Sequence, residues 1–190
     1  MSVKLEFTPG ELIAELDRQS GMARALAQGR SERALNWQPK GGKGWSVLQC
    51  VDHLLIMNRK YVKVLREAVA SNEDQLEPRK VPIQPSGWFT RWFIGTEEPP
   101  PKFKLPAPGQ LQPPSSLNGA IVDEFCDVQK QLADFVRECG EADLGDLKVK
   151  NPLAPIHLTA DTVLLLISYH NRRHLWQAAN VTRAEGFPNS

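Results

Sequence analysis

The stretch VLLLISYHNRRHLWQ at residues 163–177 decides the fold, because its apolar residues recur at helical spacing on both sides of two histidines. Thr159 can cap the N-terminus of this helix, and Asp161 lies in the first turn, where the helix dipole favours negative charge. The pattern runs to about Ala184, and Gly186 lies just beyond it. The sequence therefore predicts a long C-terminal helix with histidines embedded among apolar residues.

Three further segments show the same periodicity, and no segment of period two rises above it. The first follows TPGE, where Thr8, Pro9 and Glu11 have the spacing of a capping box. The second follows Ser46, which can cap it with Gln49 as the capping-box partner. Amphipathic helices of this kind are the components of a four-helix bundle, so we predict an all-α fold. The four predicted helices cover about residues 9–26, 47–70, 116–139 and 160–184.

Composition limits the possible functions. A chain of 190 residues is most economically a single domain, 1–190. Its net charge of +1 gives no broad electrostatic surface for nucleic acid or an anionic membrane. The N-terminus has no apolar signal core, and the longest aliphatic run, 163–167, is far too short to span a bilayer. The cysteines lack CxxC spacing and indicate free thiols. We expect a cytoplasmic protein that binds neither nucleic acid nor membranes.

Residues 72–116, between the second and third predicted helices, hold ten of the chain's fifteen prolines. Prolines at this density prevent a continuous helix and favour extended, polyproline-like chain. Loops of this length are usually functional or disordered. The segment can cover the core, form a dimer contact or close over a pocket. We expect a long proline-rich crossover that is anchored by the four aromatic residues of GWFTRWFIG: Trp88, Phe89, Trp92 and Phe93.

His170 and His174 are four residues apart and therefore project from the same side of a helix. Two imidazoles placed in this way can bind one metal ion, and neutral imidazole suits Zn, Ni, Cu or Fe. His53 is the best candidate for a third ligand, because facing helices of a bundle can bring such groups together. Three histidines without a fourth protein ligand leave positions for water or substrate. His157, in the proline-flanked loop APIHL, is assigned a surface or cap role.

The two histidine-bearing helices together resemble the DinB-like (YfiT-related) superfamily. In GWSVLQCVDHL, His53 follows Trp45 by eight residues, and HNRRHLWQ has the pattern His-x-x-x-His-Leu-x-Gln. The stretches ALNWQP and NPLAPIHLTADTV are also similar to that family, as is the length of the proline-rich crossover. The resemblance covers nearly the whole chain, and its paired motifs at matching helix positions are fairly specific.

This resemblance implies a four-helix bundle that binds a divalent metal, Zn or Ni, through His53, His170 and His174. Some members of the family join a small thiol such as bacillithiol, mycothiol or glutathione to electrophiles, others are thiol-dependent isomerases, and others have no assigned activity. Gln49 departs from the family pattern, which often has glutamate four residues before the helical histidine. Because an amide cannot act as a general base, a mechanism that needs this carboxylate is in doubt.

Other metal sites and covalent nucleophiles are excluded by the residues themselves. A di-iron bundle needs Glu three residues before histidines on two helices, and no histidine here has one. A zinc protease of the HExxH type needs Glu where this chain has Asn171. GGKGWS lacks the Walker spacing of a phosphate loop, and there is no Gly-x-Ser-x-Gly motif.

Two residues near the histidines are candidate catalytic groups. Arg173 can receive an anionic substrate unless it is solvated or salt-bridged, and Gln49 can bond to an imidazole unless it serves only as a helix cap. Gln177 is a further candidate partner for an imidazole nitrogen. Asp52 is expected to face solvent, because it lies about 100° around the helix from His53. Three other neighbours are expected to be small or core residues: Trp45, Trp176 and Cys50.

Two classes of function fit the sequence. The first is an enzyme that uses the metal to transfer a small thiol to an electrophilic substrate, or a related isomerase or hydrolase, in detoxification or stress response. The second is a non-catalytic metal- or small-molecule-binding bundle protein related to stress. The expected partners are a small-molecule thiol and an electrophile, and either class is compatible with a homodimer.

Overall fold

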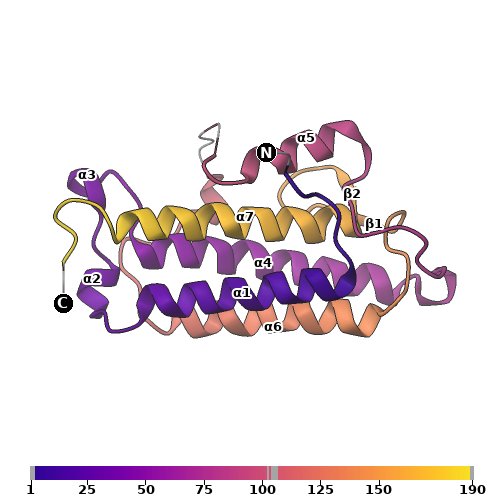
Figure 1. The fold of residues 1–190 in the computed structure, drawn as a ribbon, viewed down its shortest axis with the longest axis horizontal. Coiled ribbons are helices and arrows are strands. Elements are labelled where there is room, and N and C mark those ends of the chain that lie inside the picture. The colour runs from indigo at the N-terminus through magenta and orange to yellow at the C-terminus, as the bar shows by residue number, and fades with distance from the viewer. Residues whose placement is uncertain (1–2, 102, 104–106, 189–190) are drawn as a thin grey trace.

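The computed structural model describes residues 3–101, 103 and 107–188. Four long helices lie side by side in it, α1 packing against α6 and α7, and α4 packing against the same two helices (Figure 1). The prediction of an all-α helical bundle is confirmed. The bundle helices are α1 (Pro9–Ala27), α4 (Val47–Ala70), α6 (Ile121–Cys139) and α7 (Ala160–Val181).

The connections hold the remaining elements. None of the helices in the described part of the chain combines the length and hydropathy that crossing a bilayer requires. The connecting helices are α2 (Glu32–Leu35), α3 (Pro39–Gly42) and α5 (Gly87–Glu97), with the 3-10 turns η1 (Glu73–Gln75) and η2 (Gly109–Leu111).

The predicted N-termini follow from capping groups. Thr8 and Ser46 each accept a hydrogen bond from the backbone N–H three positions on, at 3.2 and 3.1 Å. The side chains of Glu11 and Gln49 in turn accept a bond from the backbone N–H of the capping residue, which completes a capping box at each helix. Thr159 caps α7 in the same sense, accepting a bond from a backbone N–H of the first turn. Local polar chemistry therefore fixes where three of the four long helices begin.

Two predicted helix boundaries are wrong. The third bundle helix begins at Ile121, not near residue 116, because the side chain of Asn118 accepts a 2.8 Å bond from the N–H of Ala120 and holds a turn there. The last helix ends at Val181, not near residue 184. Turn bonds follow it, and Gly186 has φ +82°, which a helix does not allow.

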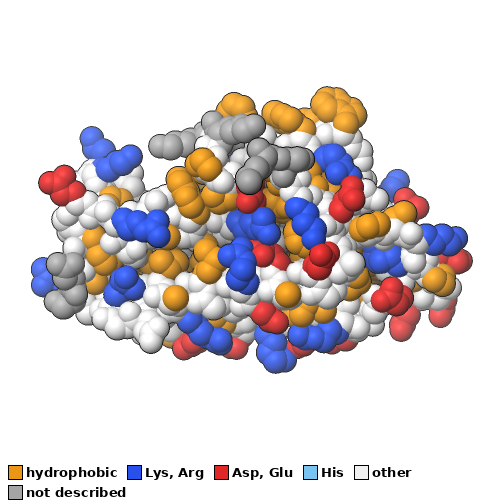
Figure 2. Space-filling model, in the orientation of Figure 1, with side chains coloured by type: hydrophobic (Ala, Val, Ile, Leu, Met, Phe, Trp, Pro, Cys, Tyr) orange, Lys and Arg blue, Asp and Glu red, His pale blue; other side chains and the backbone are white. Residues whose placement is uncertain are grey.

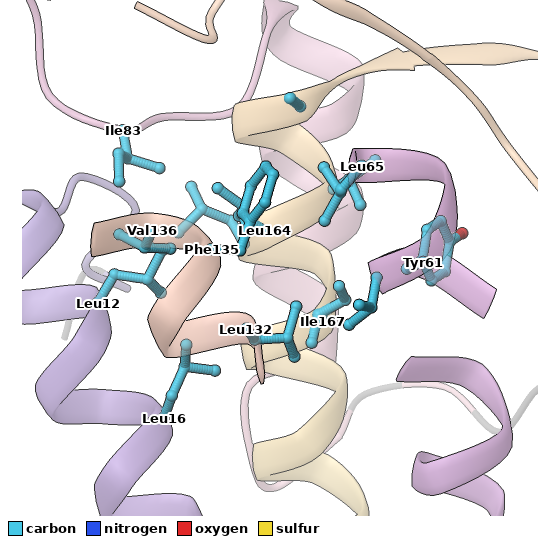
Figure 3. Packing of buried hydrophobic residues seen from close by; sticks show 14 of the residues in the cluster. Leu12, Leu16, Tyr61, Leu65, Ile83, Leu132, Phe135, Val136, Leu164 and Ile167 are labelled. Carbon is cyan, nitrogen blue, oxygen red and sulfur yellow. The ribbon is translucent and has the colours of Figure 1, made fainter. Parts of the chain in front are cut away.

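The core lies between the four long helices (Figure 3). Leucines of all four helices belong to its main cluster: Leu12 and Leu16 of α1, Leu65 of α4, Leu132 of α6 and Leu164 of α7. All five are at most 2% exposed, and burying each such side chain contributes about 1.5–3 kcal/mol. A second apolar cluster near the other end of α4 packs against α6 and α7. These two clusters hold α4 and α7 in contact along their length.

The segment 72–116 contains helix α5, which packs against α7 outside the bundle (Figure 1). The expectation of extended chain is therefore wrong for these residues. The expected aromatic anchoring is wrong for Trp88, Phe89 and Trp92, which are 80%, 58% and 54% exposed, whereas Phe93 is half-buried. Figure 2 shows hydrophobic side chains protruding along the edge where α5 lies. Ile94, Thr96 and Glu97 are the buried residues of α5 instead.

The sequence analysis did not predict a pair of three-residue strands that the structure contains. β1 (Lys148–Lys150) pairs antiparallel with β2 (His157–Thr159), and Val149 is their one fully buried side chain. Strands this short give almost no periodic signal. His157 is exposed on β2, in agreement with the surface role expected for it.

Candidate metal centre

The structure brings together His53 of α4 and His170 and His174 of α7. One ring nitrogen of each lies within 4.8 Å of those of the other two. The Nε2 atoms of His53 and His170 are 3.0 Å apart. The helical spacing of four residues places the α7 pair on one side, and the contact between α4 and α7 brings the third ring to them. Three residues from two distant parts of the sequence thus form one cluster.

The size of this cluster suits a divalent cation. Zinc binds histidine nitrogen at about 2.0–2.1 Å, which in tetrahedral geometry separates two nitrogens by about 3.3 Å. The observed spacings of 3.0 Å and up to 4.8 Å bracket that value. The side chains of His53 and His174 are buried, at 2% and 8% exposure. An ion bound here would therefore be largely shielded from water.

Hydrogen bonds fix which nitrogen carries the proton in two of the rings. Nδ1 of His53 is 2.8 Å from the backbone oxygen of Leu111, which can only accept, so this nitrogen donates. Nδ1 of His170 is 3.0 Å from a carboxylate oxygen of Glu97 and donates to it in the same way. In the neutral rings both Nε2 atoms are then unprotonated. Both lone pairs point into the cluster.

Two facing lone pairs at 3.0 Å repel each other unless a proton or a metal ion lies between them. His174 adds a third nitrogen to the same space. Its Nδ1 is buried and has no hydrogen-bond partner among the described residues. Buried polar atoms are normally paired, so this imidazole nitrogen retains the capacity to bind a further partner. The donor set, its tautomers and its burial all fit a divalent metal.

Electrostatics keep these rings available as ligands. Burial, followed by the nearby His170, lowers the pKa of His53 from 6.5 to about 4. Burial also holds the pKa of His174 well below its usual value. Metal binding needs neutral imidazole, and these two rings stay neutral at pH 7 without having to lose a proton.

The lowered pKa of His53 predicts that the metal-free protein loses stability in mild acid. Between pH 6.5 and about 4 the unfolded chain binds a proton at this residue while the folded chain does not. Stability therefore falls as the pH falls through this window, by up to about 3 kcal/mol. Urea unfolding of chelator-treated protein at several pH values measures this loss. His53→Gln removes the titration, and an equal acid loss in that variant would contradict the prediction.

Arg173 lies beside the cluster and is held in place. Its guanidinium donates a 2.9 Å bond to Glu97 and a second bond to the backbone oxygen of Phe103. Burial disfavours the Glu97 carboxylate, but its bonds with His170 and Arg173 outweigh this and keep its pKa below the usual value. The structure thus places Arg173 in an ion pair, the alternative that the sequence left open.

Glu97 is the residue at this site that sequence reasoning missed. It is buried at the end of α5 and joins His170 to Arg173. A carboxylate on the outer nitrogen of a metal-binding histidine fixes its tautomer and raises its basicity. No sequence motif marks it, because it reaches the cluster only through the packing of α5 on α7.

We expect Glu97→Gln to weaken Zn²⁺ binding by about 10–100-fold, the usual cost of losing such an outer partner. Competition against a chromogenic chelator measures this affinity. Glu98, next in the chain, pairs with Arg172, so Glu98→Gln is the matched control and is expected to bind Zn²⁺ normally. Equal Zn²⁺ affinity of Glu97→Gln and wild type would show that Glu97 does not support the metal site.

The other sequence candidates have structural partners. Gln49 completes the Ser46 capping box, as one interpretation of the sequence held, and its amide also donates a 3.0 Å bond to the oxygen of Pro114. Asp52 is buried, not facing solvent as expected, because the first turns of α4 are covered on every side. Burial raises the pKa of this carboxyl. Cys50 is fully buried, as predicted.

The two tryptophans near the cluster differ. Trp45 is half-buried, and its ring centroid lies 4.9 Å from that of His53 and 5.6 Å from that of His174. Trp176 is 37% exposed, so its predicted core position is wrong. Both residues line a cavity next to the cluster, together with Gln177.

A family model described as the DinB superfamily matches residues 15–178, which include all three clustered histidines. Neither a search of curated proteins nor a search of solved structures finds a match.

Proposed function

Because the chain belongs to the DinB superfamily, we propose that it is a metal-dependent enzyme that transfers a small thiol to an electrophilic substrate. His53, His170 and His174 hold the metal, which is Zn or Ni. The observation that supports this most directly is the 3.0 Å approach of two Nε2 atoms in rings whose Nδ1 atoms each face a hydrogen-bond acceptor. The proposal treats residues 1–190 as one domain.

Each protein group has a role in this proposal. The Leu111 carbonyl and Glu97 orient two imidazoles so that their free nitrogens converge. A bound divalent cation lowers the pKa of a thiol that joins it and so supplies a nucleophile at neutral pH. Trp45 covers the buried rings from the side of the cavity. The electrophile enters through that cavity.

Gln49 and Glu97 are not free to act as a general base. Both polar atoms of the Gln49 amide are engaged in hydrogen bonds to the chain. Glu97 is committed to His170 and Arg173. A thiol with a lowered pKa needs no base, whereas activation of water commonly does. The lack of a free base at these two residues favours thiol chemistry over hydrolysis. Arg173 has a positioning role in this proposal, because it acts through its ion pair with Glu97.

The proposal is tested by a conjugation assay with the full chain. Zn²⁺- or Ni²⁺-loaded protein is mixed with glutathione, cysteine or coenzyme A and with monochlorobimane. In the reaction the sulfur forms a bond to carbon, chloride leaves and the thiol proton goes to solvent. We expect a rate above the uncatalysed one that is lost with chelator and in His170→Ala. A rate that does not depend on metal would contradict the mechanism.

The second candidate is a non-catalytic metal- or small-molecule-binding protein. One observation favours it: the carboxylate nearest to the rings, Glu97, is already neutralised by Arg173. Tight metal binding without turnover of any thiol and electrophile pair would support this candidate over the enzyme. A stress-related role rests on the family resemblance alone in both cases.

The proposal also includes a cytoplasmic homodimer. The exposed Trp88, Phe89 and Trp92 of α5 support self-association, because clusters of large exposed apolar groups are typical of interfaces. Light scattering after gel filtration of wild type and of Trp88→Ser/Trp92→Ser tests this. A dimer that becomes a monomer in the variant is expected, and a monomeric wild type would contradict it.

A further inference from the structure

A cavity of about 670 Å³ lies beside the histidine cluster. This volume is within the range of small-molecule sites, about 300–1,000 Å³. Its walls come from three parts of the chain: the α3 turn, the C-terminal half of α7 and the crossover before α6. Figure 1 shows α3 next to the C-terminal half of α7, at the end of the bundle away from β1 and β2.

The cavity adjoins the cluster through residues in contact with it. Trp45 lines the cavity and has its ring within 5.6 Å of the rings of His53 and His174, measured between centroids. Gln112 also lines it and directly follows Leu111, whose carbonyl binds His53. The Trp45 ring thus forms the wall between this cavity and the cluster, and none of the three histidines is among the described lining residues.

The charged residues of the cavity wall are all cationic. They are Lys40, Lys43 and Arg173, and no acidic side chain occurs among the lining residues that the structure describes. Arg173 is neutralised by Glu97. Neither lysine has a carboxylate partner within 4.0 Å among the described residues. The two lysines thus leave the mouth of the cavity with an excess of positive charge.

The backbone of α3 holds Lys40 in a conformation that costs energy. Lys40 has φ 57° and ψ 40°, the left-handed region that side chains other than glycine rarely adopt. It is the non-glycine residue with positive φ in the described part of the chain, and Gly41 and Gly42 continue the turn with positive φ. Strained backbone of this kind is concentrated at functional sites.

The remaining wall is largely apolar, with three amide side chains among its described residues. Trp45 and Trp176 present indole rings to the cavity, and Pro39 and Pro101 add apolar surface. Trp176 is 37% exposed although it follows a buried stretch of α7, so a ligand could cover it. Planar apolar groups stack well on indole, and cations at the mouth select a negative group.

We propose that this cavity binds an organic anion that combines a planar apolar part with a carboxylate, sulfonate or phosphate. The apolar part lies against Trp45 and Trp176, and the negative group lies against Lys40 and Lys43. The identification of this anion as the electrophilic substrate rests on the proposed function. The binding itself does not, because the lysines and tryptophans lie outside the metal-binding triad.

Calorimetric titration of the metal-free full chain tests the proposal with two probes of equal shape, naphthalene-2-sulfonate and the neutral naphthalene-2-sulfonamide. Wild type is expected to bind the sulfonate about tenfold more tightly. In Lys40→Gln/Lys43→Gln the sulfonate affinity should fall to that of the sulfonamide. Trp176→Ala should weaken both probes.

The matched control is Lys148→Gln/Lys150→Gln, which removes the same charge from exposed residues of β1. It is expected to bind both probes as wild type does. Equal loss of sulfonate affinity in the control, no preference for the sulfonate in wild type, or no binding of either probe at millimolar concentration would overturn the proposal. Sulfonate binding is expected to persist in His170→Ala. That result would show that the anion site exists even if the proposed metal chemistry fails.

Discussion

His170→Ala is expected to abolish stoichiometric Zn²⁺ binding. The change removes one of three converging nitrogens, and the two rings that remain offer too few ligands for a tetrahedral ion in a buried site. The loss of affinity should exceed the roughly 10–100-fold cost of losing an outer hydrogen bond such as that of Glu97. Metal content after dialysis, with competition against a chelator, measures it.

His157→Ala is the matched control for this experiment, because it removes an exposed histidine of β2 that is not part of the cluster. It should bind one Zn²⁺ as tightly as wild type. Equal affinity of His170→Ala and wild type, or equal weakening of both variants, would show that the metal does not bind at the cluster.

Arg79→Ala is expected to lower the free energy of unfolding by about 3–5 kcal/mol. Arg79 forms two bonds, of 2.9 and 3.0 Å, with the carboxylate of Asp161, and their side chains are only 6% and 1% exposed. Burial raises the pKa of Asp161 even with Arg79 present, so the carboxylate is costly to keep in the fold. Removing its partner leaves an uncompensated buried charge at the start of α7.

Two further variants make this second prediction specific. Arg79→Met/Asp161→Leu removes both charges and should recover much of the lost stability, because apolar replacements of buried pairs are often neutral. Arg66→Ala removes an exposed partner of Glu138 and should cost less than about 1 kcal/mol. If urea unfolding gave Arg79→Ala and Arg66→Ala the same small loss, the argument from burial would be wrong.

The bundle helices were predictable because their signals are local. Thr8, Ser46 and Thr159 act as caps within one turn of chain, and the apolar period identifies the buried faces. The start of α6 was not predictable from such signals, because it depends on a turn that the side chain of Asn118 stabilises. Helix α5 was not predictable either. It lies among prolines, and its strongest apolar residues face outward, so neither composition nor pattern indicated a packed helix.

The same distinction holds for the site. His170 and His174 are related by helical spacing, and only two other histidines were available as a third ligand. Glu97 and the Leu111 carbonyl reach the rings through the fold of the crossover, which leaves no trace in the spacing of residues. Asp52 was placed toward solvent from its angle on the helix. That argument fails where a helix is buried all round.

The central claim is that three imidazoles hold one divalent ion between α4 and α7. Crystals of Zn²⁺-loaded protein, with diffraction recorded on both sides of the zinc absorption edge, test this directly. The predicted result is one anomalous peak within about 2.1 Å of a ring nitrogen of each of His53, His170 and His174. A map without a peak among these three rings, or with zinc bound only elsewhere on the chain, would contradict the account.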